Sequence, residues 1–159
     1  RAMHAAFDRN PRHGLSMYFL AKIMRMIGVD QIHVGTVVGK LVGTKEEVSG
    51  VANMLRSAHT KPTKETLEQK WFKTKPMLPV SSGGIHPGLI PSIMKILGNE
   101  CALLVSGGIH GHPAGPRQGA KAAMQAIEAS MEGVSLLEYS KSHKELKNAL
   151  GKWGYSTFK

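Results

Sequence analysis

The pentapeptide Ser-Gly-Gly-Ile-His occurs twice in the chain, at residues 82–86 and 106–110, each time directly after an apolar stretch. Those stretches, residues 78–81 and 102–105, are short and apolar, as buried strands are. Helical periodicity follows each pentapeptide, over about residues 88–97 and 116–131. The repeat therefore predicts two units of strand, glycine turn and helix.

A third unit of the same kind is predicted nearer the beginning of the chain. Residues 31–34 are expected to form a strand, and residues 35–40 a loop with two glycines and Lys40. Thr44 is the expected N-cap of a helix that runs to about residue 57. Short apolar strands separated by helices are typical of parallel sheets covered by helices, so the chain is expected to be α/β, as a (β/α) barrel or a doubly wound sheet.

Three further segments complete the predicted secondary structure. Residues 16–27 are expected to form an amphipathic helix that directs Lys22 and Arg25 toward water. Residues 59–77 contain five lysines and two prolines and are interpreted as a surface connection, with a short helix around residues 64–72. A final helix is expected over residues 136–150, packed on the outside.

Charge and cysteine content limit the classes of function. The 159 residues carry 21 Lys and Arg against 11 Asp and Glu, a net charge of +10 that favours an anionic partner. The single cysteine, Cys101, cannot form an internal disulfide, which favours a cytoplasmic location. Each apolar stretch is shorter than the roughly 20 residues of a membrane span, so no membrane partner is expected.

The loops that follow the strands are the candidate binding site. A strand followed by Ser-Gly-Gly leaves backbone N–H groups uncovered near a helix N-terminus, which favours the binding of phosphate, although such glycines also simply permit tight turns.

Individual side chains near these loops have more than one interpretation. His33 is either a core histidine or a donor to a ligand oxygen, and Ser82 either caps a helix or binds a hydroxyl group. Lys40 is suited to swing over a ligand. His110 and His112 have no nearby Cys, Asp or Glu, so a metal site is not expected there.

Four segments together resemble active-site segments of the ribulose bisphosphate carboxylase large subunit, in the family's order. They are residues 1–5 (RAMHA), 32–41 (IHVGTVVGKL), 78–86 (LPVSSGGIH), and Gly107-Gly108 with residues 111–113 (GHP). The resemblance extends from Arg1 to at least Ala129. Residues 139–154 are similar to the archaeal branch, form III.

The resemblance implies the C-terminal portion of a (β/α)8 TIM barrel, from the end of strand five through strand eight. Residues 1–135 would be this half of the catalytic barrel, and residues 136–159 a helical extension packed on it. The implied function is that of a fragment of a lyase that adds CO2 to ribulose 1,5-bisphosphate and gives two 3-phosphoglycerates.

The resemblance also implies a role for individual residues. Lys40 would stabilise the transition state of CO2 addition from the tip of a mobile loop. The implied contacts with the phosphates and hydroxyls of the substrate come from Arg1, His33, Ser82, Gly83, Gly84, Ser106 and Gly107. Arg1 and His33 would hold the C5 phosphate, Ser82 a hydroxyl group, and the backbone of Gly84, Ser106 and Gly107 the C1 phosphate.

Other parts of the implied site have no counterpart in the sequence. The family's Mg²⁺ ligands, which include a carbamylated lysine, and its general base are expected in an N-terminal part, because the chain begins at Arg1 and resembles a piece of a longer subunit. A second large subunit would complete the site, so a homodimer or a higher oligomer is expected. Half a barrel with two open sheet edges is expected to aggregate rather than fold alone.

Two alternatives to the carboxylase stay open. Ser106 stands where the family usually has glycine, and Val42 where it usually has glutamate, which fits a carboxylase-like enolase or isomerase acting on a related phosphosugar. The basic charge also fits a nucleic-acid-binding protein, but the lysine-rich connection has only Trp71 and Phe72 as stacking residues and no recognition motif appears. We therefore expect no nucleic acid partner.

Overall fold

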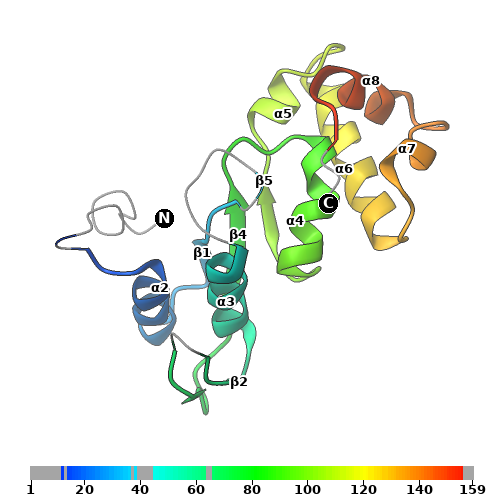
Figure 1. Ribbon diagram of the computed structural model, residues 1–159. Coiled ribbons are helices and arrows are strands. Elements are labelled where there is room, and N and C mark those ends of the chain that lie inside the picture. Colours follow the sequence, from blue (N-terminus) through cyan, green and yellow to red (C-terminus); the bar gives the residue numbers. More distant parts are fainter. Residues whose placement is uncertain (1–11, 13, 37, 39–44, 64–65, 156–159) are drawn as a thin grey trace.

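The computed structural model describes residues 12, 14–36, 38, 45–63 and 66–155. Its centre is a parallel sheet of three strands in the order β1 (Gln31–His33), β4 (Leu78–Ser82) and β5 (Ala102–Leu104), as Figure 1 shows. His33 is in register with Val80, and Ser82 with Leu104. All three strands were predicted from their apolar runs, and the parallel arrangement is confirmed.

Helices connect and cover these strands. They are α3 (Lys45–Arg56) after β1, 3-10 helix η1 (Pro87–Leu89) with α4 (Ile90–Leu97) after β4, and α5 (Gly107–His110) with α6 (Pro116–Met131) after β5. Acidic residues in the first turn of α3, Glu46 and Glu47, suit the positive end of its dipole. The predicted N-cap, Thr44, lies outside the described residues.

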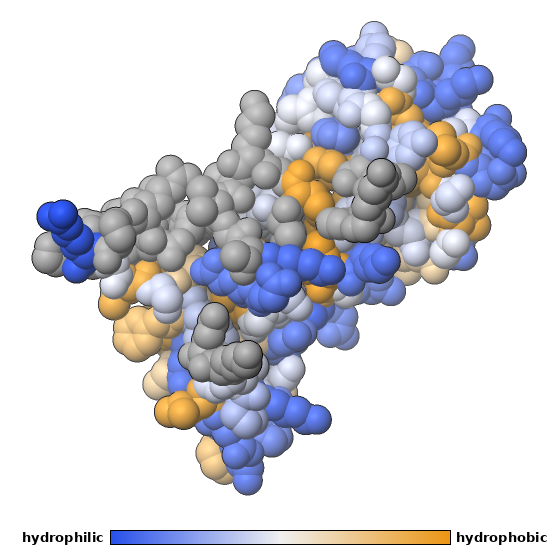
Figure 2. All heavy atoms as spheres, viewed as in Figure 1, coloured by the Kyte–Doolittle hydropathy of each residue, from blue (hydrophilic) through white to orange (hydrophobic). Residues whose placement is uncertain are grey.

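The first described helix, α2 (Met17–Met26), forms as predicted but buries a different face. Ser16 caps it by accepting a hydrogen bond from the Phe19 backbone N–H at 3.2 Å. Phe19 and Ile23 are apolar residues of this helix, yet they are 46% and 36% exposed, whereas Arg25 is only 2% exposed. Figure 2 shows this apolar surface on the lobe that carries α2. The prediction that Arg25 faces water is wrong.

Arg25 is buried because its guanidinium group satisfies backbone carbonyls that have no other helical partner. Its Nη1 donates to the carbonyl of Met54, and to that of Ser57 at 2.9 Å, beyond the end of α3. Its Nε donates to the Lys75 carbonyl at 3.1 Å, and its Cζ lies 4.1 Å from the centroid of the Trp71 ring. The side chain thus ties α2 to α3 and to the connection before β4.

The connection contains a small hairpin where a helix was predicted. Strands β2 (His59–Thr60) and β3 (Gln69–Lys70) pair antiparallel, so the predicted helix over residues 64–72 is wrong. Trp71, next to β3, is 4% exposed, and its indole N–H donates to Thr60 Oγ1 at 3.0 Å. Burial of this one large side chain outweighs a weak local helical tendency.

The single helix predicted over residues 136–150 is in fact two helices, α7 (Leu136–Tyr139) and α8 (Lys144–Trp153). Local polar contacts close the break between them. The His143 ring stacks on Tyr139 with centroids 4.0 Å apart, and the Ser140 hydroxyl donates to the Leu137 carbonyl at 2.8 Å. In the described part of the chain, no helix is both long and apolar enough to cross a membrane.

Candidate functional site

Two predicted site residues meet at the C-terminal edge of the sheet. His33 is the last residue of β1 and Ser82 the last residue of β4, and the two strands are parallel neighbours. His33 Nδ1 and Ser82 Oγ are 2.8 Å apart, which is hydrogen-bond distance. Ser82 is buried and His33 half-buried, so the pair forms a fixed polar group rather than two solvated side chains.

The first glycine turn begins directly beside this pair. Gly83 and Gly84 have φ angles of +105° and +69°, in the region that L-residues rarely adopt. This backbone turns sharply out of β4 and leaves Gly84 exposed. Pro87 follows the pentapeptide and restricts His86 to extended backbone, with φ −136° and ψ 165°. The structure therefore has a tight turn without side chains at a strand end, a shape that favours anions, and anion binding here stays a prediction.

The second copy of the pentapeptide has a different conformation, which corrects the expectation of two similar loops. Gly107 to His110 form the short helix α5, and Ser106 precedes it without a side-chain cap bond. Here Gly111 follows the histidine in place of a proline, so nothing forces the chain out of the helical region. Ser106 and Gly107 are exposed, and a Cβ on Gly107 would meet open space.

Tight packing joins the two pentapeptides, residues 82–86 and 106–110. A Cβ on Gly108 would lie 2.5 Å from the Ile85 carbonyl oxygen and 2.6 Å from His86 Cα, so only glycine fits. A Cβ on Gly119 of α6 would overlap the Ile109 carbonyl from the other side. The backbone of Ser106 and Gly107 is thereby held beside the turn at Gly83 and Gly84.

The segment after β1 is also attached to this edge. The Ser81 hydroxyl donates to the Gly35 carbonyl at 3.2 Å, and the Thr36 hydroxyl donates to the Ser82 carbonyl. These bonds fix the first residues of the loop that leads to Lys40. Arg1, Lys40 and Val42 lie outside the described residues.

The contacts of α8 were not identified as functional from the sequence. His86 stacks on Trp153, and Lys152 Nζ donates to the Gly111 carbonyl at 2.5 Å. Both side chains of α8 therefore touch residues adjoining the two glycine segments. The only local signal was the tail Lys152-Trp153-Gly154, and no periodicity relates it to residue 86 or 111.

His112, considered above as a metal ligand, is instead part of the packing between helices. Its Nδ1 accepts a hydrogen bond from the Ala114 backbone N–H at 3.1 Å, so its Nε2 carries the proton and donates to the Glu145 carbonyl at 3.0 Å. Among the residues that the structure describes, no group of three or more His, Cys, Asp or Glu side chains could hold a metal ion.

Exposed glycine-segment residues (Gly84, Ser106 and Gly107), an imidazole and a hydroxyl thus lie where parallel strands end, in a protein of net charge +10. Such an edge is chemically suited to an anionic, hydroxylated ligand. The fold and this edge define an α/β protein with a polar site at the carboxyl ends of its strands. The chain belongs to the family of the ribulose bisphosphate carboxylase large chain, whose catalytic domain matches residues 1–153.

Relatives from archaea support this assignment. The chain is 52% identical over 155 residues to a ribulose bisphosphate carboxylase of Methanosarcina acetivorans, covering 96% of this chain and 36% of the relative. It is 53% identical over 161 residues to that of Thermococcus kodakarensis, covering 99% and 36%. The chain therefore spans about a third of the length of the curated relatives it matches.

Solved structures of archaeal Rubisco proteins support the same family assignment. A crystal structure of an archaeal Rubisco has a TM-score of 0.90 at 51% identity, covering 99% of this chain and 37% of that one. A dimeric archaeal Rubisco from Hyperthermus butylicus has a TM-score of 0.89 at 47% identity, covering 98% and 36%. This chain therefore shares the α/β fold of the matching third of these proteins.

Proposed function

We propose that this chain forms the phosphate-binding part of a ribulose bisphosphate carboxylase large subunit, which adds CO2 to ribulose 1,5-bisphosphate to give two 3-phosphoglycerates. The observation that carries the proposal is the 2.8 Å contact between His33 and Ser82 beside the glycine turn. It supports a ligand that has both an anionic group and hydroxyl groups. Membership of the carboxylase family then favours this bisphosphate.

The three parallel strands are proposed as strands six, seven and eight of a (β/α)8 barrel. Their order β1-β4-β5 follows the chain, and helices connect them, as in such barrels. Residues 1–135 would belong to the barrel, and residues 136–159 would form a helical extension. In such barrels phosphate sites commonly follow strands seven and eight, and here Ser82 ends β4 while Ser106 follows β5.

Each polar group has a proposed role in binding. Gly84, Ser106 and Gly107 are exposed residues, and their backbone N–H groups would bind the C1 phosphate, with Gly83 providing the turn. His33, with Arg1, would hold the C5 phosphate, and Ser82 would bind a hydroxyl group. Because both ends of the substrate carry negative charge, these groups fix its direction in the site.

Lys40 is the proposed catalytic residue of this part of the subunit. A positive charge placed over the position where CO2 adds would stabilise the negative charge that develops on the new carboxylate. Its loop begins at Gly35 and Thr36, which are attached to β4 by hydrogen bonds. This attachment supports a loop with a fixed base and a lysine able to close over the substrate.

The remaining parts of the site are proposed to come from elsewhere. The ligands of Mg²⁺, including a carbamylated lysine, and the general base would lie in other segments of the large subunit, since the chain spans 34% to 37% of its relatives. A second large subunit would complete the site. The Rubisco of Hyperthermus butylicus is dimeric and that of Pyrococcus horikoshii octameric, which supports an oligomer. A cytoplasmic location also stays a prediction.

Ser106 favours one alternative, a carboxylase-like enolase or isomerase acting on a related phosphosugar. Its exposed side chain stands at the start of the second glycine segment, where it could contact a phosphate or crowd it. Such an enzyme would enolise its substrate without adding CO2.

The test uses the full-length large subunit, ribulose 1,5-bisphosphate and isotopically labelled bicarbonate. A carboxylase incorporates the label into 3-phosphoglycerate, and Lys40→Ala abolishes incorporation. The Lys73→Ala variant, which changes an exposed lysine in the connection, serves as the matched control. Substrate consumption without label incorporation would support the isomerase, and the absence of both reactions would contradict the proposed function.

A further inference from the structure

Helix α8 contacts two glycine segments, residues 83–86 after β4 and residues 107–111 after β5, through the side chains of its last turn. Figure 1 shows α8 lying beside α5 and α6, on the side away from β1. Trp153 and Lys152, at its C-terminal end, contact the segments that contain the two pentapeptides. None of the substrate-binding roles proposed above uses either residue.

The first contact is an aromatic stack. The ring centroids of His86 and Trp153 are 5.9 Å apart with 17° between the ring planes. His86 follows the turn at Gly83 and Gly84 by two residues, so its ring fixes the outgoing end of that turn. Within the described part of the chain, the buried His86 Nδ1 has no hydrogen-bond partner, and the stack on Trp153 is a contact that orients this ring.

The second contact is with the segment that follows α5. Gly111 lies so close to Trp153 that a Cβ at this position would be 3.3 Å from Trp153 Cζ2. Lys152 Nζ donates to the Gly111 carbonyl and lies 5.2 Å from the centroid of the Trp153 ring. One indole thus touches the last residue of the first pentapeptide, His86, and the residue that follows the second, Gly111.

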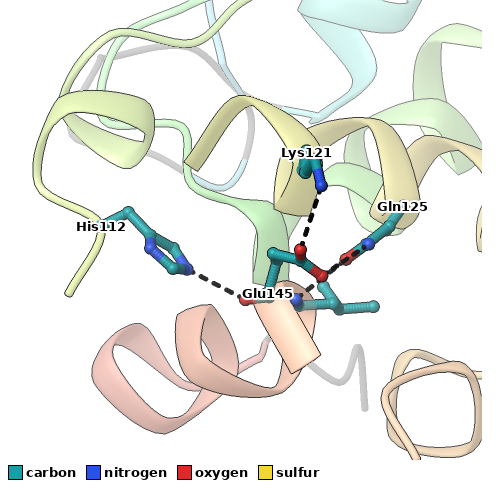
Figure 3. Close-up of polar contacts among 5 residues, drawn as sticks. His112, Lys121, Gln125 and Glu145 are labelled. Carbon is teal, nitrogen blue, oxygen red and sulfur yellow. Dashed lines mark hydrogen bonds and ion pairs between the residues drawn. The ribbon is translucent and has the colours of Figure 1, made fainter. Parts of the chain in front are cut away.

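The other end of α8 is anchored independently, as Figure 3 shows. The Glu145 carboxylate accepts hydrogen bonds from Gln125 Nε2 at 3.1 Å and Lys121 Nζ at 3.4 Å. The bond from Gln125 contributes most to lowering the pKa of Glu145. Gln125 Oε1 in turn accepts from the Leu146 backbone N–H at 3.0 Å. Because these bonds fix α8 to α6, the position of Trp153 is fixed as well.

We propose that Trp153 is a positioning residue that sets the distance between the backbone N–H group of Gly84 and those of Ser106 and Gly107. The proposal rests on the function proposed above, in which these groups share one phosphate. The indole holds the residues after both glycine segments, while Gly108 holds the segments in direct contact. Trp153 itself contacts no substrate atom.

The physical consequence follows from the geometry of phosphate binding. Hydrogen bonds from N–H groups weaken when donor and acceptor are more than about 3.2 Å apart. Two segments that share one phosphate must therefore keep their separation to within a fraction of an ångström. Removal of the indole leaves a gap between His86 and Gly111, into which either segment can move.

The test compares Trp153→Ala and Trp153→Phe in the full-length large subunit. Phenylalanine retains a ring that can stack on His86, whereas alanine does not. Lys147→Ala is the matched control, because Lys147 is an exposed residue of the same helix. Steady-state kinetics with ribulose 1,5-bisphosphate give KM and kcat, calorimetry with inorganic phosphate gives Kd, and circular dichroism reports folding.

In the expected result, Trp153→Ala raises both KM and the Kd for phosphate about tenfold, equivalent to about 1.4 kcal/mol, while kcat changes less than about twofold. Trp153→Phe and Lys147→Ala stay within about twofold of the unchanged protein. A folded Trp153→Ala protein with unchanged KM and Kd would overturn the proposal, as would a fall in kcat alone. If Trp153→Ala does not fold, His86→Ala, which removes the other half of the stack, decides on the same criteria.

The two proposals fail in different ways. A protein that has no activity on ribulose 1,5-bisphosphate but binds phosphate in a Trp153-dependent way contradicts the proposed function and supports the positioning role. A protein that carboxylates the bisphosphate with the same KM before and after substitution of Trp153 supports the proposed function and contradicts the positioning role. A protein that binds no phosphate at all overturns the positioning role directly.

Discussion

The side chains of His33 and Ser82 lie 2.8 Å apart although 49 positions separate them in the chain. They meet because parallel strands place their carboxyl ends at one edge of a sheet, and each is the last residue of its strand. The contact gives the imidazole a fixed orientation. It is also the point from which the first prediction follows.

Substitution Ser82→Ala should lower kcat/KM for ribulose 1,5-bisphosphate by about ten- to a hundredfold in the full-length subunit, since a lost bond to a buried polar group costs about 1–3 kcal/mol. The contact of His33 Nδ1 with the Ser82 hydroxyl is lost, and the proposed contact of Ser82 with a substrate hydroxyl group disappears. Ser130→Ala is the control, because the Ser130 hydroxyl donates to the carbonyl of Ala126 within its own helix, α6. Equal kinetics for both variants would contradict the proposed site.

Two adjacent glycines should respond in opposite ways to substitution by alanine. Gly107 has open space around it and lies in a helix, so Gly107→Ala should leave thermal stability unchanged or raise it slightly. It should still weaken phosphate binding, because the methyl group stands at the proposed anion site. Gly108→Ala should lower the melting temperature, because its Cβ would lie 2.5 Å from the Ile85 carbonyl oxygen. Thermal melts and phosphate calorimetry separate the two effects, and equal melting temperatures would refute the close packing.

Substitution Arg25→Met should reduce the free energy of unfolding by about 3 kcal/mol, because charged hydrogen bonds to buried carbonyls are worth about 1.5–3 kcal/mol each and are not additive. The carbonyls of Met54, Ser57 and Lys75 lose their donor. Lys22→Met on the same helix serves as the control, with an effect below about 1 kcal/mol, because it removes only a cation–π contact with Trp71. Urea unfolding of the full-length subunit measures both, and similar losses would count against the structural role of Arg25.

Stability should fall in mild acid through His86. Burial lowers the pKa of its imidazole below the ordinary 6.5, so the folded protein binds this proton less readily than the unfolded chain does. The contribution of His86 to stability is therefore complete above pH 6.5 and declines as the pH falls from 6.5 toward the lowered pKa of the folded state. Lys152, close to the Trp153 ring on which His86 stacks, adds positive charge to the surroundings.

The measurement is unfolding free energy against pH for the unchanged protein and for His86→Phe, which retains the stacking ring without a titratable group. The variant should show a shallower decline over this range. His110→Gln is the control, since it replaces the corresponding histidine of the second pentapeptide at an exposed position. Identical pH slopes for the unchanged protein and His86→Phe would exclude His86 as the source.

Much of the fold could be predicted from local pattern. The apolar runs gave all three strands of the parallel sheet, and the helix over residues 116–131 was predicted with the bounds that the structure has. Family membership could be recognised because long motifs of several residues are specific. His33, Ser82 and the glycine turns were candidates because side chains at strand ends converge in parallel sheets. Arg1 and Lys40 lie outside the described residues, so the roles proposed for them stay predictions.

By itself, the sequence determined the three parallel strands, the helices that follow them and the family to which the chain belongs, because hydrophobic periodicity and motif order are local properties. Tertiary structure decided the rest. Identical pentapeptides form a turn after Ser82 and a helix at residues 107–110. The next residue, Pro87 or Gly111, sets a local preference, but packing around Gly108 and Gly119 selects the form. Arg25 is buried and Trp153 reaches His86 for the same reason: their partners are distant in sequence, and only the packed chain brings them within contact distance.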